Sequence, residues 1–166
     1  GFTEDVDIKE LRSLADKNDA LLLHDIGSGL VISRKFLEKE NISIFNSEPT
    51  IQESLEDGAD LVMFSGDKLF GSVQSGIIAG NQKLIKKIKD SPLFRTYRCS
   101  PFTLYELQET TKKYISKREL GIPIWKMISL KYEELYKRVE EISKVIKFEH
   151  SIVDDYSIMG GGTMPN

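Results

Sequence analysis

Several features that are common in proteins are scarce or absent here, and each absence excludes a class of protein. Cys99 is the single cysteine of the 166 residues, so no disulfide can form within the chain, and a reducing, cytoplasmic location is the simpler expectation. No apolar run reaches the length of a membrane span, and no signal peptide is visible. The net charge of −3 argues against a broadly basic nucleic-acid-binding protein.

The residues that are present indicate a soluble globular protein. Hydrophobic residues make up 40% of the chain and charged residues 30%, so a core can form without disulfides or metals. The chain starts with Gly1-Phe2 rather than Met. It therefore begins after processing, after a tag, or inside a longer protein.

Hydrophobic periodicity predicts an α/β fold. Apolar residues recur at helical spacing in some segments, and short apolar runs bounded by glycine or polar residues indicate buried strands in others. Their alternation predicts a mostly parallel sheet with flanking helices, and a change of character near residues 118–122 indicates a soft domain boundary. The expected helices cover 7–18, 49–55, 81–90, 103–117 and 131–147, and the expected strands cover 20–24, 60–64 and 75–80.

Two polar clusters directly follow predicted strands, at Asp25–Gly29 and at Ser65–Lys68. Ligands of open parallel sheets bind beyond the carboxyl ends of the strands, so Asp25 and Lys68 are expected to face one crevice. An acid and a lysine there suit pyridoxal phosphate (PLP), because the lysine forms a Schiff base and the acid keeps the pyridine nitrogen protonated. The same pattern also fits a turn-forming aspartate and a solvated lysine.

A longer series of motifs resembles one PLP-dependent family. The segment 57–80, which reads DGADLVMFSGDKLFGSVQSGIIAG, resembles the cofactor-lysine region of bacterial selenocysteine synthase, the L-seryl-tRNA(Sec) selenium transferase. The likeness continues upstream through His24–Gly29 and 48–55. Downstream it includes Arg95, Arg98, Ile122-Pro123 and the glycine-rich stretch Gly160–Pro165.

This resemblance implies a fold, a reaction and partners. The fold is the aspartate-aminotransferase-like (fold type I) large domain over residues 1–120, with a linking helix and the beginning of a small C-terminal α+β domain over 121–166. The reaction converts seryl-tRNA(Sec) to selenocysteinyl-tRNA(Sec) with PLP and selenophosphate, through an aminoacrylate. A homo-oligomer is expected as well. Family members are more than twice this length, so the chain is expected to be a fragment that is inactive alone.

The resemblance also assigns roles to individual residues. Lys68 takes the place of the lysine that holds PLP and then moves the α-proton as a general base. Asp67 is its acidic neighbour, which assists the departing hydroxyl. Asp25 takes the position of the partner to the pyridine nitrogen, and Ser65 belongs to the cofactor-binding set. No metal site is expected.

The resemblance assigns the substrate oxyanion to Arg95 and Arg98, whose forked guanidinium groups suit selenophosphate. Surface charge beside a helix end is the alternative interpretation of both residues. Two positions depart from the family, because Cys99-Ser100-Pro101 stands where relatives usually carry an aspartate–lysine pair, and Ser72-Val73 replaces a glycine–proline pair.

Other residues are expected to have structural roles. His24 should point away from Asp25 and be buried with a hydrogen-bond partner, since neighbouring strand residues face opposite sides. Trp125, with Ile124 and Met127, is expected in the core. A lysine cluster is either the solvated face of a helix, the more common case, or a contact for tRNA phosphates; it comprises Lys83, Lys86, Lys87 and Lys89.

Two other functions stay open at this point. One is a related PLP-dependent lyase that acts on a free amino acid, for which no tRNA-binding module is needed. The other is a portion without catalysis of its own that serves structure or assembly, because sites of this fold are commonly built between subunits.

Overall fold

Three strands form one small sheet in the computed structural model, which describes residues 6–155. β1 (Leu23–Gly27) is parallel to β2 (Leu61–Ser65), and β2 is antiparallel to β3 (Gly76–Gly80). The predicted α/β class is confirmed, but a mostly parallel sheet is wrong for the described residues. Only residues 66–75 join β2 to β3, and parallel strands need a longer crossover that usually contains a helix.

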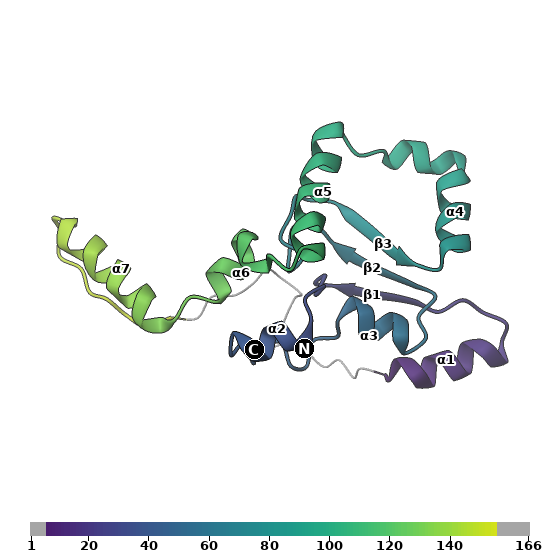
Figure 1. Ribbon diagram of the computed structural model, residues 1–166, viewed down its shortest axis with the longest axis horizontal. Helices are drawn as coiled ribbons and strands as arrows, with labels where there is room; N and C mark the ends of the chain where they lie inside the picture. Colours follow the sequence, from purple (N-terminus) through teal and green to yellow (C-terminus); the bar gives the residue numbers. More distant parts are fainter. Residues whose placement is uncertain (1–5, 156–166) are drawn as a thin grey trace.

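Helices flank this sheet, and the five predicted ones end within two residues of the expected positions. The short elements at residues 34–39, 92–97, 119–121 and 123–128 were not predicted. In Figure 1, α1 and α3 lie beside β1, α4 and α5 lie beside β3, and α7 extends away from the sheet. The helices are α1 (Ile8–Lys17), α2 (Arg34–Lys39), α3 (Ile51–Glu56), α4 (Gln82–Asp90), η1 (Pro92–Tyr97), α5 (Pro101–Ile115), η2 (Glu119–Gly121), α6 (Pro123–Ile128) and α7 (Tyr132–Val145).

The first strand starts three residues later than the apolar run over 20–24 predicts. The Asp60 carboxylate accepts the N–H of Leu22 and a guanidinium N–H of Arg12, each at 2.8 Å. These side-chain hydrogen bonds hold the segment before β1 in place of strand pairing. As a result, Asp25 lies within the paired strand rather than in the loop that follows it.

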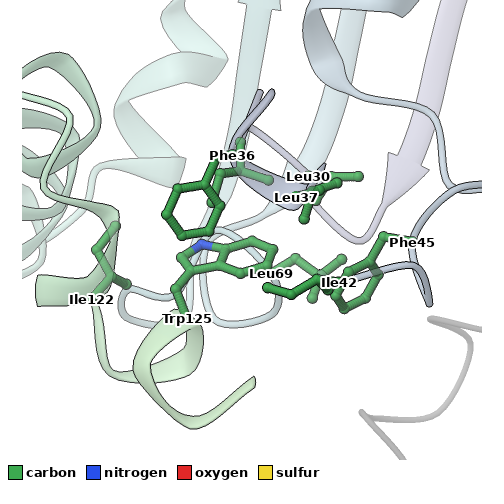
Figure 2. Packing of buried hydrophobic residues seen from close by; sticks show 9 residues of the cluster. Leu30, Phe36, Leu37, Ile42, Phe45, Leu69, Ile122 and Trp125 are labelled. Carbon is green, nitrogen blue, oxygen red and sulfur yellow. The ribbon is translucent and has the colours of Figure 1, made fainter. Parts of the chain in front are cut away.

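One of two hydrophobic cores is built around Trp125, which is fully buried (Figure 2). The rings of Phe36 and Phe45 contact it edge-on at centroid distances of 6.3 and 5.7 Å. The expected core position of Trp125 is confirmed, whereas Met127 is 59% exposed and that expectation is wrong. The other buried members of this core are Leu30, Ile32, Leu37, Ile42, Leu69 and Ile122.

The second core lies under the sheet and joins β2 to the lysine-bearing turn that follows it. Val62 and Phe64 of β2 are buried in it, and Phe70 packs on Phe64 at a ring distance of 5.9 Å. Tyr114, near the end of α5, packs against both cores. The region around residues 69–70 is therefore held by both cores. Each buried large side chain contributes about 1.5–3 kcal/mol to the free energy of folding.

A half-buried guanidinium network fixes the loop between α2 and α3. Arg34 donates to both carboxylate oxygens of Glu53 at 2.8 and 2.7 Å, and also to the carbonyls of Phe45 and Glu48. Glu53 in turn accepts the N–H of Thr50 and completes the capping box of α3. The hydrogen bonds from Arg34 lower the pKa of Glu53 from 4.5 to about 2.

His24 lies on the α3 side of β1. Its Nδ1 is 3.1 Å from the Ser54 hydroxyl, so the expected hydrogen bond is confirmed, and the side chain is half-buried rather than fully buried.

Candidate functional site

Lys68 lies in the turn directly after β2, and this turn is tied to the end of β1. The N–H of Leu69 donates to the carbonyl of Ser28 at 2.9 Å, and the N–H of Gly71 donates to the carbonyl of Lys68 at 2.9 Å. Leu69 is 1% exposed and Phe70 is 6% exposed. The two residues after Lys68 therefore anchor the turn in the cores, while the lysine itself stays half-buried.

A relay of two aromatic residues supports the same turn from the side of α5 and α6. The indole N–H of Trp125 donates to the Tyr114 hydroxyl at 2.8 Å, and that hydroxyl donates to the Phe70 carbonyl at 2.9 Å. Burial raises the pKa of Tyr114, so the hydroxyl keeps its proton and its role as a donor. Sequence reasoning placed Trp125 in the core and found no signal for this relay.

Close packing fixes the rest of the loop between β2 and β3. Gly66 exchanges backbone hydrogen bonds with Ser72 and Ser75. Gly71 has a φ of +75°, and a Cβ there would lie 2.5 Å from Ile124 Cγ2 and 2.6 Å from Ile122 Cγ2. Only glycine fits this position, because both the backbone conformation and the contact with α6 exclude a side chain.

The carboxylate and the amine predicted for one crevice both lie near Gly27. Asp25 Oδ1 accepts the Gly27 N–H at 3.1 Å. The Lys68 ammonium nitrogen lies 3.8 Å from the position that a Cβ on Gly27 would occupy. Gly27 has a φ of +63°, which favours glycine and leaves this surface open between the two groups. The structure thus places each group near Gly27, and the pairing of Asp25 with Lys68 in one site stays a prediction.

The remaining residues of the cofactor set lie beside this point. Asp67 is exposed in the turn, next to Lys68, and Ser65 is the half-buried last residue of β2. Sequence reasoning missed Ser28, whose hydroxyl is buried without a hydrogen-bond partner among the described residues. Ser28 is flanked by Gly27 and bonded through its carbonyl to Leu69, so an unsatisfied polar group borders the lysine turn.

Arg95 and Arg98 are not brought to Lys68 within this chain. Both are exposed, on η1 and directly after it, whereas the lysine turn contacts Tyr114 near the other end of α5. At 1.5 Å per helical residue, α5 separates the two places by about 20 Å. The departure at Cys99-Ser100-Pro101 has a local role here, because Ser100 caps α5 and Pro101 is its first residue.

A shallow pocket of about 240 Å³ lies elsewhere, between α2 and the end of α5, and contains none of the predicted site residues. Its cations, among them Lys39 and Lys117, lie at the C-terminal ends of these helices and complement the helix dipoles. Within residues 6–155 no cluster of three or more potential metal ligands is present. The helices described are also too short or too polar to cross a membrane.

The residues around Gly27 fit a PLP site. A lysine amine suits covalent attachment of an aldehyde, and a carboxylate tied to the same glycine suits the pyridine nitrogen. The open glycine surface lets a flat ring approach the backbone, and the buried Ser28 hydroxyl is available for a polar partner. Together the sheet and its turn define an α/β protein with a candidate lysine site at the ends of two parallel strands.

Comparison with known proteins places the chain in one family. The family model described as L-seryl-tRNA selenium transferase matches residues 1–166, and the chain belongs to this family. Relatives named L-seryl-tRNA(Sec) selenium transferase are 43% identical over 177 residues in Clostridium perfringens (strain ATCC 13124), 39% over 172 in Alkaliphilus oremlandii and 37% over 166 in Campylobacter fetus. The matches cover 99–100% of this chain but 36% of each relative, so the chain spans about a third of their length.

The predicted family is therefore confirmed over the whole chain. The glycine-rich stretch Gly160–Pro165, which forms part of the resemblance, lies outside the residues that the structure describes.

Proposed function

We propose that this chain supplies the cofactor-lysine part of a PLP-dependent enzyme that converts seryl-tRNA(Sec) to selenocysteinyl-tRNA(Sec) with selenophosphate. The observation that carries the proposal is that Lys68 Nζ and the Asp25 carboxylate both lie near Gly27. The names of the relatives supply the substrate and the reaction class. PLP, tRNA and the selenium donor are part of the proposal.

Lys68 would hold PLP covalently, and Asp25 would pair with its pyridine nitrogen. When bound, PLP supplies an electron sink for the negative charge that develops at the α-carbon of the substrate. The Asp25 carboxylate keeps the pyridine nitrogen protonated through its opposite charge. Ser65 and Ser28 border the same site and orient the cofactor.

Lys68 and Asp67 move the protons of the reaction. Lys68 Nζ would take the proton from the α-carbon of the seryl group. Asp67, exposed beside it, would assist the departing β-hydroxyl, and the proton held by Lys68 would pass to that oxygen so that water leaves. The anchored turn serves this step, because Leu69 and Phe70 fix the backbone and leave only the lysine side chain free to swing.

Arg95 and Arg98 bind the selenophosphate oxyanion in the site of a second copy of the chain. Within one chain, α5 spans about 20 Å between Pro101, close after the arginines, and Tyr114 at the lysine turn, so binding in a neighbouring site fits their position. Both are exposed, as residues that complete a neighbouring site need to be. A homo-oligomer is therefore part of the proposal.

The two-part organisation is proposed on the same grounds. Residues 1–120 form part of the large cofactor-binding domain, and 121–166 comprise a linking helix and the beginning of a small domain. Trp125 anchors α6, the linking helix, in the core built by residues 30–69. α7 extends beyond this core in Figure 1.

The proposal is tested by assaying the complete polypeptide that carries this chain. We expect selenocysteinyl-tRNA to form from seryl-tRNA(Sec) and selenophosphate, and free serine to be left unchanged. The variant Lys68→Arg should lose conversion by a factor of at least 10³, since an arginine cannot attach the cofactor. The matched variant Lys126→Arg, at an exposed lysine of α6, should keep it. Turnover of free serine alone would indicate the lyase alternative.

A further inference from the structure

One segment of the chain has a charge opposite to that of the rest. Residues 82–98 contain six lysine and arginine side chains and a single carboxylate, Asp90, which gives a formal charge of +5. Because the whole chain carries −3, the remaining residues together carry −8. The cations are thus concentrated on α4 and η1, a surface that we call the α4–η1 surface (residues 82–98).

The structure places three of these six cations on one face of α4. Lys83, Lys86 and Lys87 are exposed and recur at the spacing of three and four residues that aligns side chains along a helix. In Figure 1, α4 lies beyond the edge strand β3 and continues into the segment that leads to α5. The opposite face of α4 carries its three half-buried apolar residues, Leu84, Ile85 and Ile88.

The stability of α4 explains only Lys87 and Lys89, which lie in the last turn, where the helix dipole favours cations. Like charges three and four residues apart repel each other, and Lys83 lies in the first turn, where the helix dipole favours acidic residues. No ion pair with another described residue compensates for the charge of these lysines. By contrast, α7 mixes both signs along its exposed surface, as a solvated helix commonly does.

We propose that the α4–η1 surface is a contact site for the phosphate backbone of RNA. Lysines act as point charges toward phosphates, and a stripe of them follows a backbone without reading bases. Tyr97, at the end of the same surface, is 80% exposed and offers a ring on which an unpaired base can stack. The choice of RNA as the polyanion rests on the proposed function, in which the substrate is carried on a tRNA.

The position of this surface agrees with that substrate. It includes Arg95 and Arg98, the residues proposed to bind the selenium donor in a neighbouring site. A tRNA that lies along α4 would therefore approach the place where its seryl group reacts.

The test compares two charge-matched triple variants of the complete polypeptide, loaded with PLP. Lys83→Gln, Lys86→Gln and Lys87→Gln remove three charges from α4, and Lys131→Gln, Lys137→Gln and Lys144→Gln remove three from the α7 region. Binding of a fluorescent, uncharged tRNA(Sec) transcript is measured by anisotropy between 50 and 200 mM salt. We expect the α4 variant to bind at least tenfold more weakly at 100 mM salt, with a salt slope smaller by about 2–3. The α7 variant should stay within twofold of the unmodified protein.

Three results would overturn the inference: an unchanged affinity of the α4 variant, an equal loss in both variants, or a loss that light scattering traces to a changed oligomeric state. None of them concerns the proposed function, which is scored separately by conversion of seryl-tRNA at saturating tRNA. Conversely, a protein that binds tRNA through α4 but produces no selenocysteinyl-tRNA would refute the proposed function and leave this surface in place.

Discussion

The turn that carries Lys68 and the segment that carries Arg95 and Arg98 are built in opposite ways. The turn is held by backbone bonds to Ser28, by the Tyr114 hydroxyl and by the buried side chains that follow the lysine. The arginine segment is exposed throughout 92–98, and its hydrogen bonds reach no further than a few residues along the chain. The chain thus fixes the lysine turn by itself, whereas the arginine segment is exposed, and in the proposed function a second copy of the chain sets its final position.

The largest effect is expected where the lysine turn is supported from a distance. Trp125→Ala removes a fully buried ring and the N–H that binds Tyr114, so unfolding should become easier by about 3–5 kcal/mol. Chemical denaturation measures the loss, with Met127→Ala as the control on the same helix, expected within about 0.5 kcal/mol. Equal effects of the two substitutions would contradict the central role of Trp125.

A smaller effect is expected from the glycine that lets α6 approach the turn. Gly71→Ala combines a positive φ with contacts to Ile122 and Ile124, and we expect a loss of about 1–3 kcal/mol. Gly76→Ala is the matched control, because a Cβ there would meet nothing within 4 Å and its φ is not positive. Equal melting temperatures of the two variants would contradict the role of Gly71 in the packing of α6 against the turn.

Lowering the pH tests a third part of the molecule, the Arg34–Glu53 network. The pKa of Glu53 falls from 4.5 to about 2 in the folded chain, so its stabilisation is complete above about pH 4.5 and is lost as the pH falls toward 2. The side chain is 39% exposed and partly screened, so the loss should be about 1 kcal/mol rather than the full value of the shift. Glu53→Gln should flatten this part of the stability–pH curve, and an unchanged slope would count against the network.

The smallest effect on stability is expected in the arginine segment. Arg95→Ala and Arg98→Ala should each change the free energy of unfolding by less than about 0.5 kcal/mol, because both side chains are exposed. If these residues bind the donor in a neighbouring site, the same variants should raise the selenophosphate KM at least tenfold in the complete enzyme. Mixing Arg98→Ala with Lys68→Arg subunits sharpens the test, because only mixed oligomers then contain unmodified sites.

The sequence contains enough to predict most of this architecture and the centre of the site. Apolar runs and helical spacing give the strands and long helices, and the polar residues after two of them place Asp25 near Lys68. The strand β3 was predicted, but its antiparallel direction was missed, although the ten residues before it leave no room for a crossover. The Tyr114–Trp125 relay has no sequence signal, because it joins two helices to a turn through tertiary packing. The distance from Arg98 to Lys68 likewise has no sequence signal, because it depends on the direction of α5 in the fold.

The most direct test of the account is to identify the lysine that carries the cofactor. PLP is added to the complete polypeptide, the visible absorption is recorded, and borohydride then fixes the bound cofactor for peptide mapping. The account predicts an absorption band of lysine-bound PLP and a label on Lys68, both lost in Lys68→Arg and both kept in Lys126→Arg. A label spread over surface lysines such as Lys83 and Lys126, with the band intact in Lys68→Arg, would contradict it.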